Sequence, residues 1–288
     1  MNKLILGCGY LGRRVAQAWL GDGHEVLALT RSLETAARLR ARGIRPIVGD
    51  VTGSLDLSDC DEIDTLLFAI GFDRTAGKSI REVYVDGLRR VLDCLPAPPR
   101  RFIYISSTGV YAQNDGQWVN EQSLSVPLRE GGKACLAAEE LLRQCAIGER
   151  TMILRLAGIY GADRLPKLQD VIAGRPIDGA ADGYLNLIHV DDAVRVVLAA
   201  ETQLMPPELL LVSDGAPVLR GEFYRELARR SHSPPPQFTA PNAGSPTAAR
   251  ASTDKRIDNS RLRELLQLQF RFPSYVEGLA SILATQGD

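Results

Sequence analysis

The sequence has few of the residues that build metal sites and disulfide frameworks. Its 288 residues include only three histidines, far apart in the chain, and five cysteines with no CxxC pair. Such scattered cysteines predict reduced thiols rather than disulfides or a zinc site. No apolar run approaches the roughly 20 residues that span a bilayer, and the apolar N-terminus ends at two arginines too early for a signal peptide. We expect a cytoplasmic protein with no metal and no membrane partner.

An excess of charge of either sign is also lacking. The 34 lysines and arginines nearly balance the 35 acidic residues, for a net charge of −1. This balance gives no support to a nucleic-acid partner. Hydrophobic residues make up 45% of the chain and charged residues 24%, as is typical of globular proteins. The length allows one domain of ordinary size and a second, smaller lobe.

Apolar strand-like segments alternate with amphipathic segments over the first 200 residues. This alternation predicts parallel strands joined by helical crossovers. The fold class is therefore α/β, a doubly wound and mostly parallel Rossmann sheet with a smaller C-terminal substrate lobe. Strands are expected at 3–7, 25–30, 45–50, 64–71, 101–107 and 150–158, with helices at 11–20, 33–42, 80–95 and 134–145.

The regular alternation weakens after about residue 160. We expect a dinucleotide-binding domain over 1–160, to which 186–201 returns, and a smaller lobe made of 161–185 and 202–288. The segment 231–253, rich in Pro, Ser and Ala, is either a mobile surface loop or a lid over a substrate pocket. Further elements are expected as helices at 192–201, 221–230, 258–266 and 274–284 and a strand at 209–214.

A GxGxxG motif lies between the first expected strand and the first expected helix. Gly7, Gly9 and Gly12 allow a tight turn and let backbone N–H groups approach a pyrophosphate at the helix N-terminus. The second strand ends at Arg31, where NAD-binding proteins usually carry an acidic residue. Because an arginine pairs with a 2′-phosphate, NADP is favoured and NAD is less favoured. The alternative for Arg31 is a solvated side chain. The predicted cofactor-binding residues are Gly7, Gly9, Tyr10, Leu11, Gly12, Thr30, Arg31, Ser32, Asp50, Val51, Ala69, Ile70, Gly71 and Ser106.

Several segments in this order resemble one family. They are the glycine loop, GDV (49–51), FIYISSTGVYA (102–112), LAAEELL (136–142), RLAGIYG (155–161) and NLIHVDDAV (186–194). The chain is similar to the extended short-chain dehydrogenase/reductases, the NAD-dependent epimerase/dehydratase branch. The segment from Lys255 and Arg256 to the C-terminus resembles the tail of an atypical subgroup.

The resemblance implies four catalytic groups: a tyrosine, a lysine four residues later, a serine or threonine, and an asparagine. The serine matches Ser107. The tyrosine position falls on Gly131, the lysine position on Cys135 and the asparagine position on Tyr84. Lys133 lies about 200° around a helix from position 131, so it cannot replace the lysine. The usual proton relay is therefore predicted to be absent.

Three side chains are possible substitutes, and each has a structural alternative. Tyr84 and Tyr111 carry phenols, and Cys135 can act as a thiolate if a cation lowers its pKa. The predicted catalytic residues are thus Ser107, Tyr84 and Tyr111. Asp191 and Asp192 are interpreted as helix-capping residues, and His189 as structural.

Two functions remain open at this stage. The first is an NADP(H)-binding oxidoreductase or epimerase-like enzyme with a non-standard active site, acting on a small polar molecule such as a nucleotide-sugar. The second is a non-catalytic NADP(H)-binding sensor with no small-molecule substrate. The apolar positions of 80–95 and 133–146 permit a homodimer through a four-helix contact, and equally a face buried within one chain.

Overall fold

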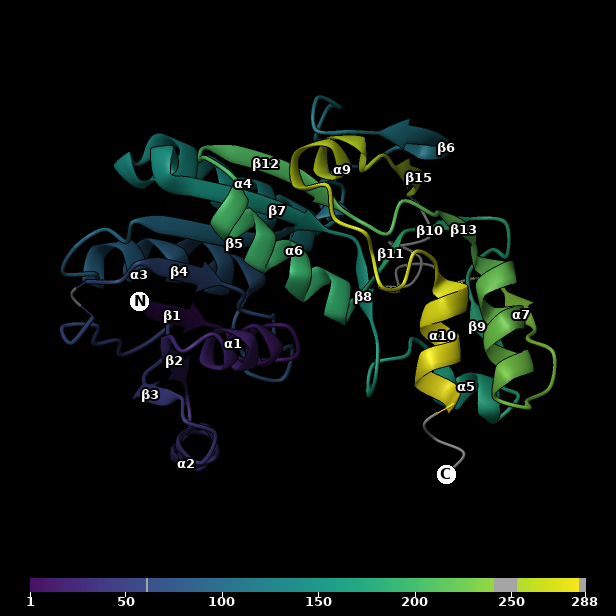
Figure 1. Ribbon diagram of the computed structural model, residues 1–288. Coiled ribbons are helices and arrows are strands. Elements are labelled where there is room, and N and C mark those ends of the chain that lie inside the picture. The colour runs from purple at the N-terminus through teal and green to yellow at the C-terminus, as the bar shows by residue number, and fades with distance from the viewer. Residues whose placement is uncertain (61, 241–252, 285–288) are drawn as a thin grey trace. The chain divides into compact units, whose positions relative to one another are not determined.

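The computed structural model describes residues 1–60, 62–240 and 253–284 and contains a seven-stranded sheet (Figure 1). Its strands are β1 (Asn2–Leu6), β2 (Glu25–Thr30), β3 (Arg45–Val48), β4 (Thr65–Phe68), β5 (Arg101–Ser107), β7 (Thr151–Leu156) and β12 (Glu208–Val212). They lie in the order β12-β7-β5-β4-β1-β2-β3. The pairs β1–β2, β1–β4, β2–β3 and β4–β5 are parallel. The predicted doubly wound, mostly parallel sheet is confirmed.

Helices follow the strands and cover the apolar side chains that the strands present. Every residue of β4 and all but the first of β1 are buried, as expected for strands covered on both faces. The elements between the strands are α1 (Gly12–Gly21), α2 (Leu33–Arg40), η1 (Glu82–Asp86), α3 (Gly87–Cys94), α4 (Glu130–Gln144) and α6 (Val190–Gln203). Among them α1 packs on β1 and β2, α2 on β2 and β3, and α4 on β5 and η1.

Two of the expected helices differ from the sequence prediction. The helix expected at 80–95 begins with a π-helical segment, η1, before α3 continues in α-helical geometry. A π-helical turn carries one extra residue per turn and often marks a functional site. The helix expected at 134–145 starts earlier, at Glu130, so Gly131 lies in the first turn of α4.

The later part of the chain contains short strands that the sequence did not predict. They are β6 (Asn114–Val119), β8 (Gly158–Tyr160), β9 (Ile177–Asp178), β10 (Tyr184–Leu185), β11 (Leu187–His189), β13 (Val218–Leu219), β14 (Phe238–Thr239) and β15 (Asp254–Ile257). They form four two-stranded sheets: β8–β11, β9–β14 and β6–β15 are parallel, and β10–β13 is antiparallel. The helices here are η2 (Thr108–Val110), η3 (Ala146–Arg150), α5 (Leu168–Ile172), α7 (Arg220–Arg230), α9 (Ser260–Leu266) and α10 (Tyr275–Ala284).

The chain divides into two compact units whose boundaries differ from the predicted ones. The first unit comprises residues 1–107, 130–155 and 194–210, and the second comprises 108–129, 156–193 and 211–288. The predicted domain of 1–160 therefore loses 108–129 to the second unit, because these residues follow β5 and include β6, which pairs with β15. Most of the segment expected to be a lid or a mobile loop, residues 241–252, lies outside the described residues.

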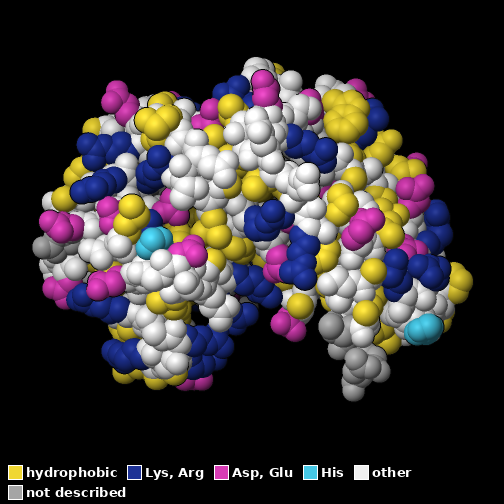
Figure 2. All heavy atoms as spheres, viewed as in Figure 1, with side chains coloured by type: hydrophobic (Ala, Val, Ile, Leu, Met, Phe, Trp, Pro, Cys, Tyr) yellow, Lys and Arg dark blue, Asp and Glu magenta, His cyan; other side chains and the backbone are white. Residues whose placement is uncertain are grey.

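Charges of both signs are mixed on the surface. Figure 2 shows lysines and arginines interspersed with acidic side chains over the visible face, so this face presents no extended field of one sign. In the part of the chain that the structure describes, no helix combines the length and the apolar character needed to cross a membrane.

Candidate functional site

The predicted cofactor residues follow strands whose carboxyl ends lie at one edge of the sheet. Leu6 of β1 pairs with Leu29 of β2 and with Phe68 of β4, and Phe68 pairs with Tyr104 of β5. Because these strands are parallel, the loops that follow them emerge side by side. Ligands bind at this edge in open α/β sheets, so the fold brings the predicted loops together.

The glycine loop between β1 and α1 has the geometry of a phosphate cradle. Gly7 has a φ of +101°, and a Cβ there would lie 2.4 Å from the carbonyl carbon of Ala69. A Cβ on Gly12 would lie 2.3 Å from the carbonyl oxygen of Gly7. A Cβ on Gly9, by contrast, would meet no atom of the described residues within 4 Å. Gly7 and Gly12 are therefore required for the turn, while Gly9 leaves open space beside the N-terminus of α1. These residues fit the pyrophosphate of a dinucleotide.

Arg31, at the end of β2, has a partner that the sequence did not suggest. Its guanidinium Nη2 donates to Oδ2 of Asp73 at 3.0 Å, and both side chains are exposed. Asp73 also accepts from the side chain and the backbone N–H of Thr75, at 2.6 and 2.9 Å. The bond from the Thr75 hydroxyl, together with Arg31, lowers the pKa of Asp73 to about 2. The Arg31 guanidinium, which was predicted to bind a 2′-phosphate, is therefore paired with the carboxylate of Asp73.

Other predicted cofactor residues shape the loops. Asp50 holds its turn by accepting from the backbone N–H and the hydroxyl of Thr52. The carbonyl of Val51 accepts from Arg90. Thr30 ends β2, and Ser32 caps α2 by accepting the N–H of Thr35. The buried Leu11 precedes α1, and the ring of Tyr10 lies under the guanidinium of Arg14. After β4, the N–H of Ala69 donates to the carbonyl of Leu6, and Ile70 and Gly71 follow.

The first two turns of α4 carry the positions that the family resemblance assigns to tyrosine and lysine. Gly131 is half-buried, and a Cβ there would meet only Cδ1 of Ile80, at 3.5 Å. Cys135 is buried. Lys133 is exposed and donates to Glu130 at 2.8 Å. Because α4 begins at Glu130, Lys133 lies about 200° around the helix from position 131 and faces away from it.

Tyr84 lies in η1, close to Cys135. Burial raises the pKa of its phenol, the nearby Cys135 thiol raises it further, and a hydrogen bond with the backbone of Phe72 partly offsets the rise. Among the described residues, the groups that shift this pKa include no cation. The phenol therefore keeps its proton at neutral pH, unlike a tyrosine activated by a lysine.

Ser106 and Ser107 end β5 and have different surroundings. The hydroxyl of Ser106 is buried and donates to Oε1 of Glu139 at 2.6 Å. The buried Arg155 of β7 also holds Glu139, at 2.9 and 2.6 Å. The predicted cofactor residue Ser106 is thus engaged in a structural network. Ser107 is half-buried at the carboxyl edge of the sheet, the edge at which the cofactor loops emerge.

The remaining predicted catalytic residue, Tyr111, lies in the second unit, as do Asp192 and His189, which were interpreted from the sequence as structural. Tyr111 is fully buried, and its hydroxyl donates to the carbonyl oxygen of Asn120 at 2.9 Å; this arrangement supports its structural alternative. The carboxylate of Asp192 accepts the backbone N–H groups of Arg271 and Phe272, both at 2.8 Å. His189 lies against the Phe272 ring, with centroids 3.9 Å apart. Asp192 and His189 therefore fix the segment that precedes α10.

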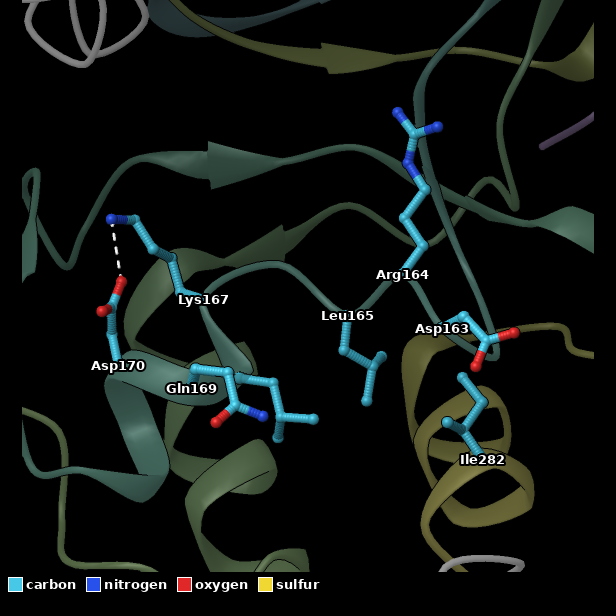
Figure 3. Close-up of a pocket in the computed structure, with 8 residues that line it drawn as sticks. Asp163, Arg164, Leu165, Lys167, Gln169, Asp170 and Ile282 are labelled. Carbon is cyan, nitrogen blue, oxygen red and sulfur yellow. Dashed lines mark ion pairs between the residues drawn. The ribbon is translucent and has the colours of Figure 1, made fainter. Parts of the chain in front are cut away.

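A pocket of about 420 Å³ lies within the second unit, between the 163–170 loop and α10 (Figure 3). Its acidic and basic groups neutralise one another: Asp170 pairs with Lys167 at 3.0 Å and with Arg175 at 2.7 Å, and both lower its pKa. In Figure 3, Arg164 points away from this ion pair. The pocket lining is Asp163, Arg164, Leu165, Lys167, Leu168, Gln169, Asp170 and Ile282.

Sequence reasoning missed three charged residues with defined partners. Asp73 was not considered as a site residue, and the buried pair of Glu139 with Arg155 was not foreseen. Their partners are distant in sequence, so local patterns carry no signal for them. A weak signal did exist for Glu139, a charged residue on the apolar side of an otherwise amphipathic helix.

The fold and the glycine cradle define a dinucleotide-binding protein of the Rossmann type. A family model for the NAD dependent epimerase/dehydratase family matches residues 4–209. The chain belongs to this family. Family membership makes it a relative of NAD-dependent oxidoreductases and epimerases, and the substrate is not defined by it.

Individual relatives cover most of the chain. Protein YeeZ of Escherichia coli (strain K12) is 26% identical over 280 residues, 95% of this chain and 97% of the relative. A 4-hydroxy-2-methyl-3-oxo-4-farnesyl-3,4-dihydroquinoline-1-oxide ketoreductase of Stigmatella aurantiaca is 32% identical over 231 residues, 74% of this chain and 67% of the relative. A solved UDP-glucuronic acid 4-epimerase of Bacillus cereus, in complex with UDP-glucuronic acid and NAD, superimposes with a TM-score of 0.78 at 22% identity over 99% and 98% of the two chains. This last likeness shows the shared fold.

Proposed function

We propose that the protein is an NADP(H)-dependent reductase that acts on the carbonyl group of a small polar substrate through a non-standard active site. The main support for this proposal is the open space at Gly9 within an otherwise closed glycine turn, together with Arg31 at the end of β2. The 32% identity to a ketoreductase supports carbonyl reduction. A nucleotide-sugar carbonyl is one substrate of this class.

The residues of the first unit have separable tasks in this proposal. When bound, the nicotinamide supplies a hydride to the carbonyl carbon. The Ser107 hydroxyl, at the carboxyl end of β5, orients the carbonyl oxygen. The neutral phenol of Tyr84 donates the proton that the developing alkoxide needs.

The raised pKa of Tyr84 is compatible with proton donation. An alkoxide is more basic than a phenolate, so the proton still moves downhill from Tyr84 to the product oxygen. Without a nearby cation, the phenolate that remains is poorly stabilised. We therefore expect slow turnover compared with an enzyme that has a lysine-activated tyrosine.

Cofactor choice depends on two residues rather than one. For Arg31 to bind a 2′-phosphate, the phosphate must replace the Asp73 carboxylate. An exposed ion pair contributes little, whereas a guanidinium–phosphate contact is charge-assisted and often bidentate. The 2′-phosphate of NADP(H) therefore displaces the Asp73 carboxylate from Arg31. Asp73 reduces the preference for NADP(H) over NAD(H) without reversing it.

Fluorescence titration with NADPH and NADH tests the cofactor proposal. Arg31→Glu should weaken NADPH binding by about tenfold or more and leave NADH binding nearly unchanged, because a charge-assisted contact is lost. Asp73→Asn should strengthen NADPH binding by about two- to fivefold. Arg38→Gln, which removes another exposed arginine paired with Glu34, is the control and should change neither affinity. Equal affinities of the wild type for both cofactors would refute the proposal.

Oxidation of NADPH in the presence of a carbonyl panel tests catalysis. The panel should include keto-sugar nucleotides and prenylated aromatic ketones, and turnover is followed at 340 nm. Ser107→Ala should lower kcat/KM at least tenfold, and Tyr84→Phe should lower kcat, because the proton donor is lost. Unchanged kcat in Tyr84→Phe would exclude Tyr84 as the donor.

A second function is favoured by one specific observation. Positions 131 and 135 carry a glycine and a buried cysteine, which supply neither an acid nor a cation. A non-catalytic protein that senses NADP(H) needs the glycine cradle and no catalytic groups. Tight NADPH binding combined with turnover equal to the buffer blank across the whole panel would establish this alternative.

A further inference from the structure

Lys255 occupies an inward-facing position of a strand. In β15, Lys255 and Ile257 are buried, whereas Asp254 and Arg256 are more exposed. Lys255 is 8% exposed and Ile257 is fully buried. A lysine at a position suited to an apolar side chain is costly unless its ammonium group is compensated.

The charged neighbours of Lys255 in β15 have other partners. Oδ1 of Asp254 accepts the backbone N–H of Tyr184 at 2.7 Å. Arg256 donates to the carbonyl oxygen of Gly116 at 2.7 Å, and its guanidinium lies over the rings of Trp118 and Tyr184. Both side chains project to the face of the strand opposite Lys255, because side chains alternate along a strand. Among the described residues, the Lys255 ammonium donates no hydrogen bond and forms no ion pair with a carboxylate.

The charged group facing Lys255 from another segment is itself a cation. Burial, and to a smaller extent Arg129, lower the pKa of Lys255 to about 8, while Asp254 opposes the change. Two positive groups near each other, one of them mostly removed from water, repel. An anion placed between them would relieve both the repulsion and the desolvation.

The backbone around Lys255 is held in place. The side-chain amide of Asn186 donates to the Lys255 carbonyl at 2.8 Å and accepts the N–H of Ile257 at 2.7 Å. This brace fixes the direction in which the lysine stem leaves the strand. Preorganised donors bind an anion without having to be ordered first.

We infer that Lys255 and Arg129, both in the second unit, form a binding site for a small anionic ligand that carries a phosphate or a carboxylate. This anion site is independent of the proposed reductase function.

Competitive acetylation of lysines, read by peptide mass spectrometry, tests the site without cofactor or turnover. The full chain is labelled at pH 7.5 with increasing inorganic phosphate or malonate, with sodium chloride at equal ionic strength as the baseline. At an anion concentration ten times Kd, labelling of Lys255 should slow by about tenfold, following mass action. The exposed Lys133 of the same molecule should label at an unchanged rate.

Variants separate this site from a lysine that merely extends to solvent. Arg129→Gln should weaken the protection of Lys255 by about tenfold, because one charge-assisted donor is lost. Glu130→Gln, which alters the adjacent residue and its ion pair with Lys133, should leave it unchanged. Stronger protection by phosphate identifies a phosphorylated ligand, and stronger protection by malonate identifies a carboxylated one.

The inference fails if neither anion protects Lys255, if Lys133 is protected equally, or if Lys255 does not react under any condition. Protection without NADPH oxidation would retain the anion site and overturn the reductase. Oxidation of NADPH without protection would retain the reductase and overturn the anion site.

Discussion

Gly9 and Gly7 belong to one loop but should respond differently to the same substitution. Gly9 has open space around its missing Cβ, whereas Gly7 has a positive φ and closely faces Ala69. Gly9→Ala should therefore keep the Tm of the wild type and weaken NADPH binding at least tenfold, because the methyl group occupies the space the pyrophosphate needs. Gly7→Ala should lower the Tm itself.

Thermal unfolding without cofactor and fluorescence titration with NADPH measure the two effects separately. If Gly9→Ala bound NADPH as tightly as the wild type, the open space at Gly9 would not be the phosphate site. If Gly7→Ala were as stable as the wild type, its contact with Ala69 would not constrain the turn.

At the level of residues, the sequence predicts what is local. The glycine loop could be recognised because the spacing of three glycines and the flanking strand and helix lie within about twenty residues. The partner of Arg31 could not, since Asp73 lies 42 residues away and depends on the loop after β4. The same holds for Arg129 and Lys255, which lie far apart in the sequence but act on one another in the folded protein.

At the level of elements, α4 is fastened to the sheet by a buried charge. Glu139 is fully buried and accepts from Ser106 of β5 and Arg155 of β7. Glu139→Gln should lower the free energy of unfolding by about 3–5 kcal/mol, because Arg155 keeps its charge and loses its counter-ion. Chemical denaturation with urea measures this loss.

Glu140→Gln provides the matched control in the same helix. Glu140 is exposed, and it pairs with Arg143 and Gln144 at the surface. Its loss should change the free energy of unfolding by less than about 1 kcal/mol. Similar losses in the two variants would show that the buried network contributes no more than a surface pair.

Helices and strands whose position follows from their own residue pattern were predicted. Strands that form only by pairing with a distant segment were not. The strands of the central sheet are continuous apolar runs, so their positions follow from the sequence. The two-residue strands β9, β10, β13 and β14 exist only because a neighbouring segment pairs with them. The π-helical start of the 80–95 helix was also missed, because the periodicity of apolar residues does not reveal one inserted residue.

For the whole molecule, Asp214 should make stability depend on pH. It is buried, its Oδ2 has no hydrogen-bond partner among the described residues, and burial raises its pKa to about 7. An unfolded aspartate has a pKa of about 3.9. Between these values the folded state binds more protons than the unfolded state, so stability falls as pH rises from about 4 to 7, by up to about 1.4 kcal/mol per pH unit.

Asp214→Asn should remove this dependence, because the amide matches the protonated carboxyl in shape and does not ionise. Urea unfolding at several pH values between 4 and 8 measures it. Asp182→Asn, at an exposed position, should keep the slope of the wild type. An unchanged slope in Asp214→Asn would mean that Asp214 is ionised in the folded protein at low pH.

The division of the chain into units was the least predictable property. Linear order suggests that 108–129 belongs with the strand before it, yet its strand β6 pairs with β15, about 140 residues later. A boundary of this kind is decided by long-range pairing, which one sequence does not display. The fold class was nevertheless predictable, because it depends on the alternation of strands and helices.

The buried anchor of α4 lies at Glu139, more than two turns after Gly131. Folding and reactivity are therefore encoded at different points along the same helix. The first turn is consequently a position where chemistry can be removed or installed with little effect on folding. A larger side chain can therefore be introduced at Gly131, where an added Cβ would lie 3.5 Å from Cδ1 of Ile80, without changing the buried anchor of the helix.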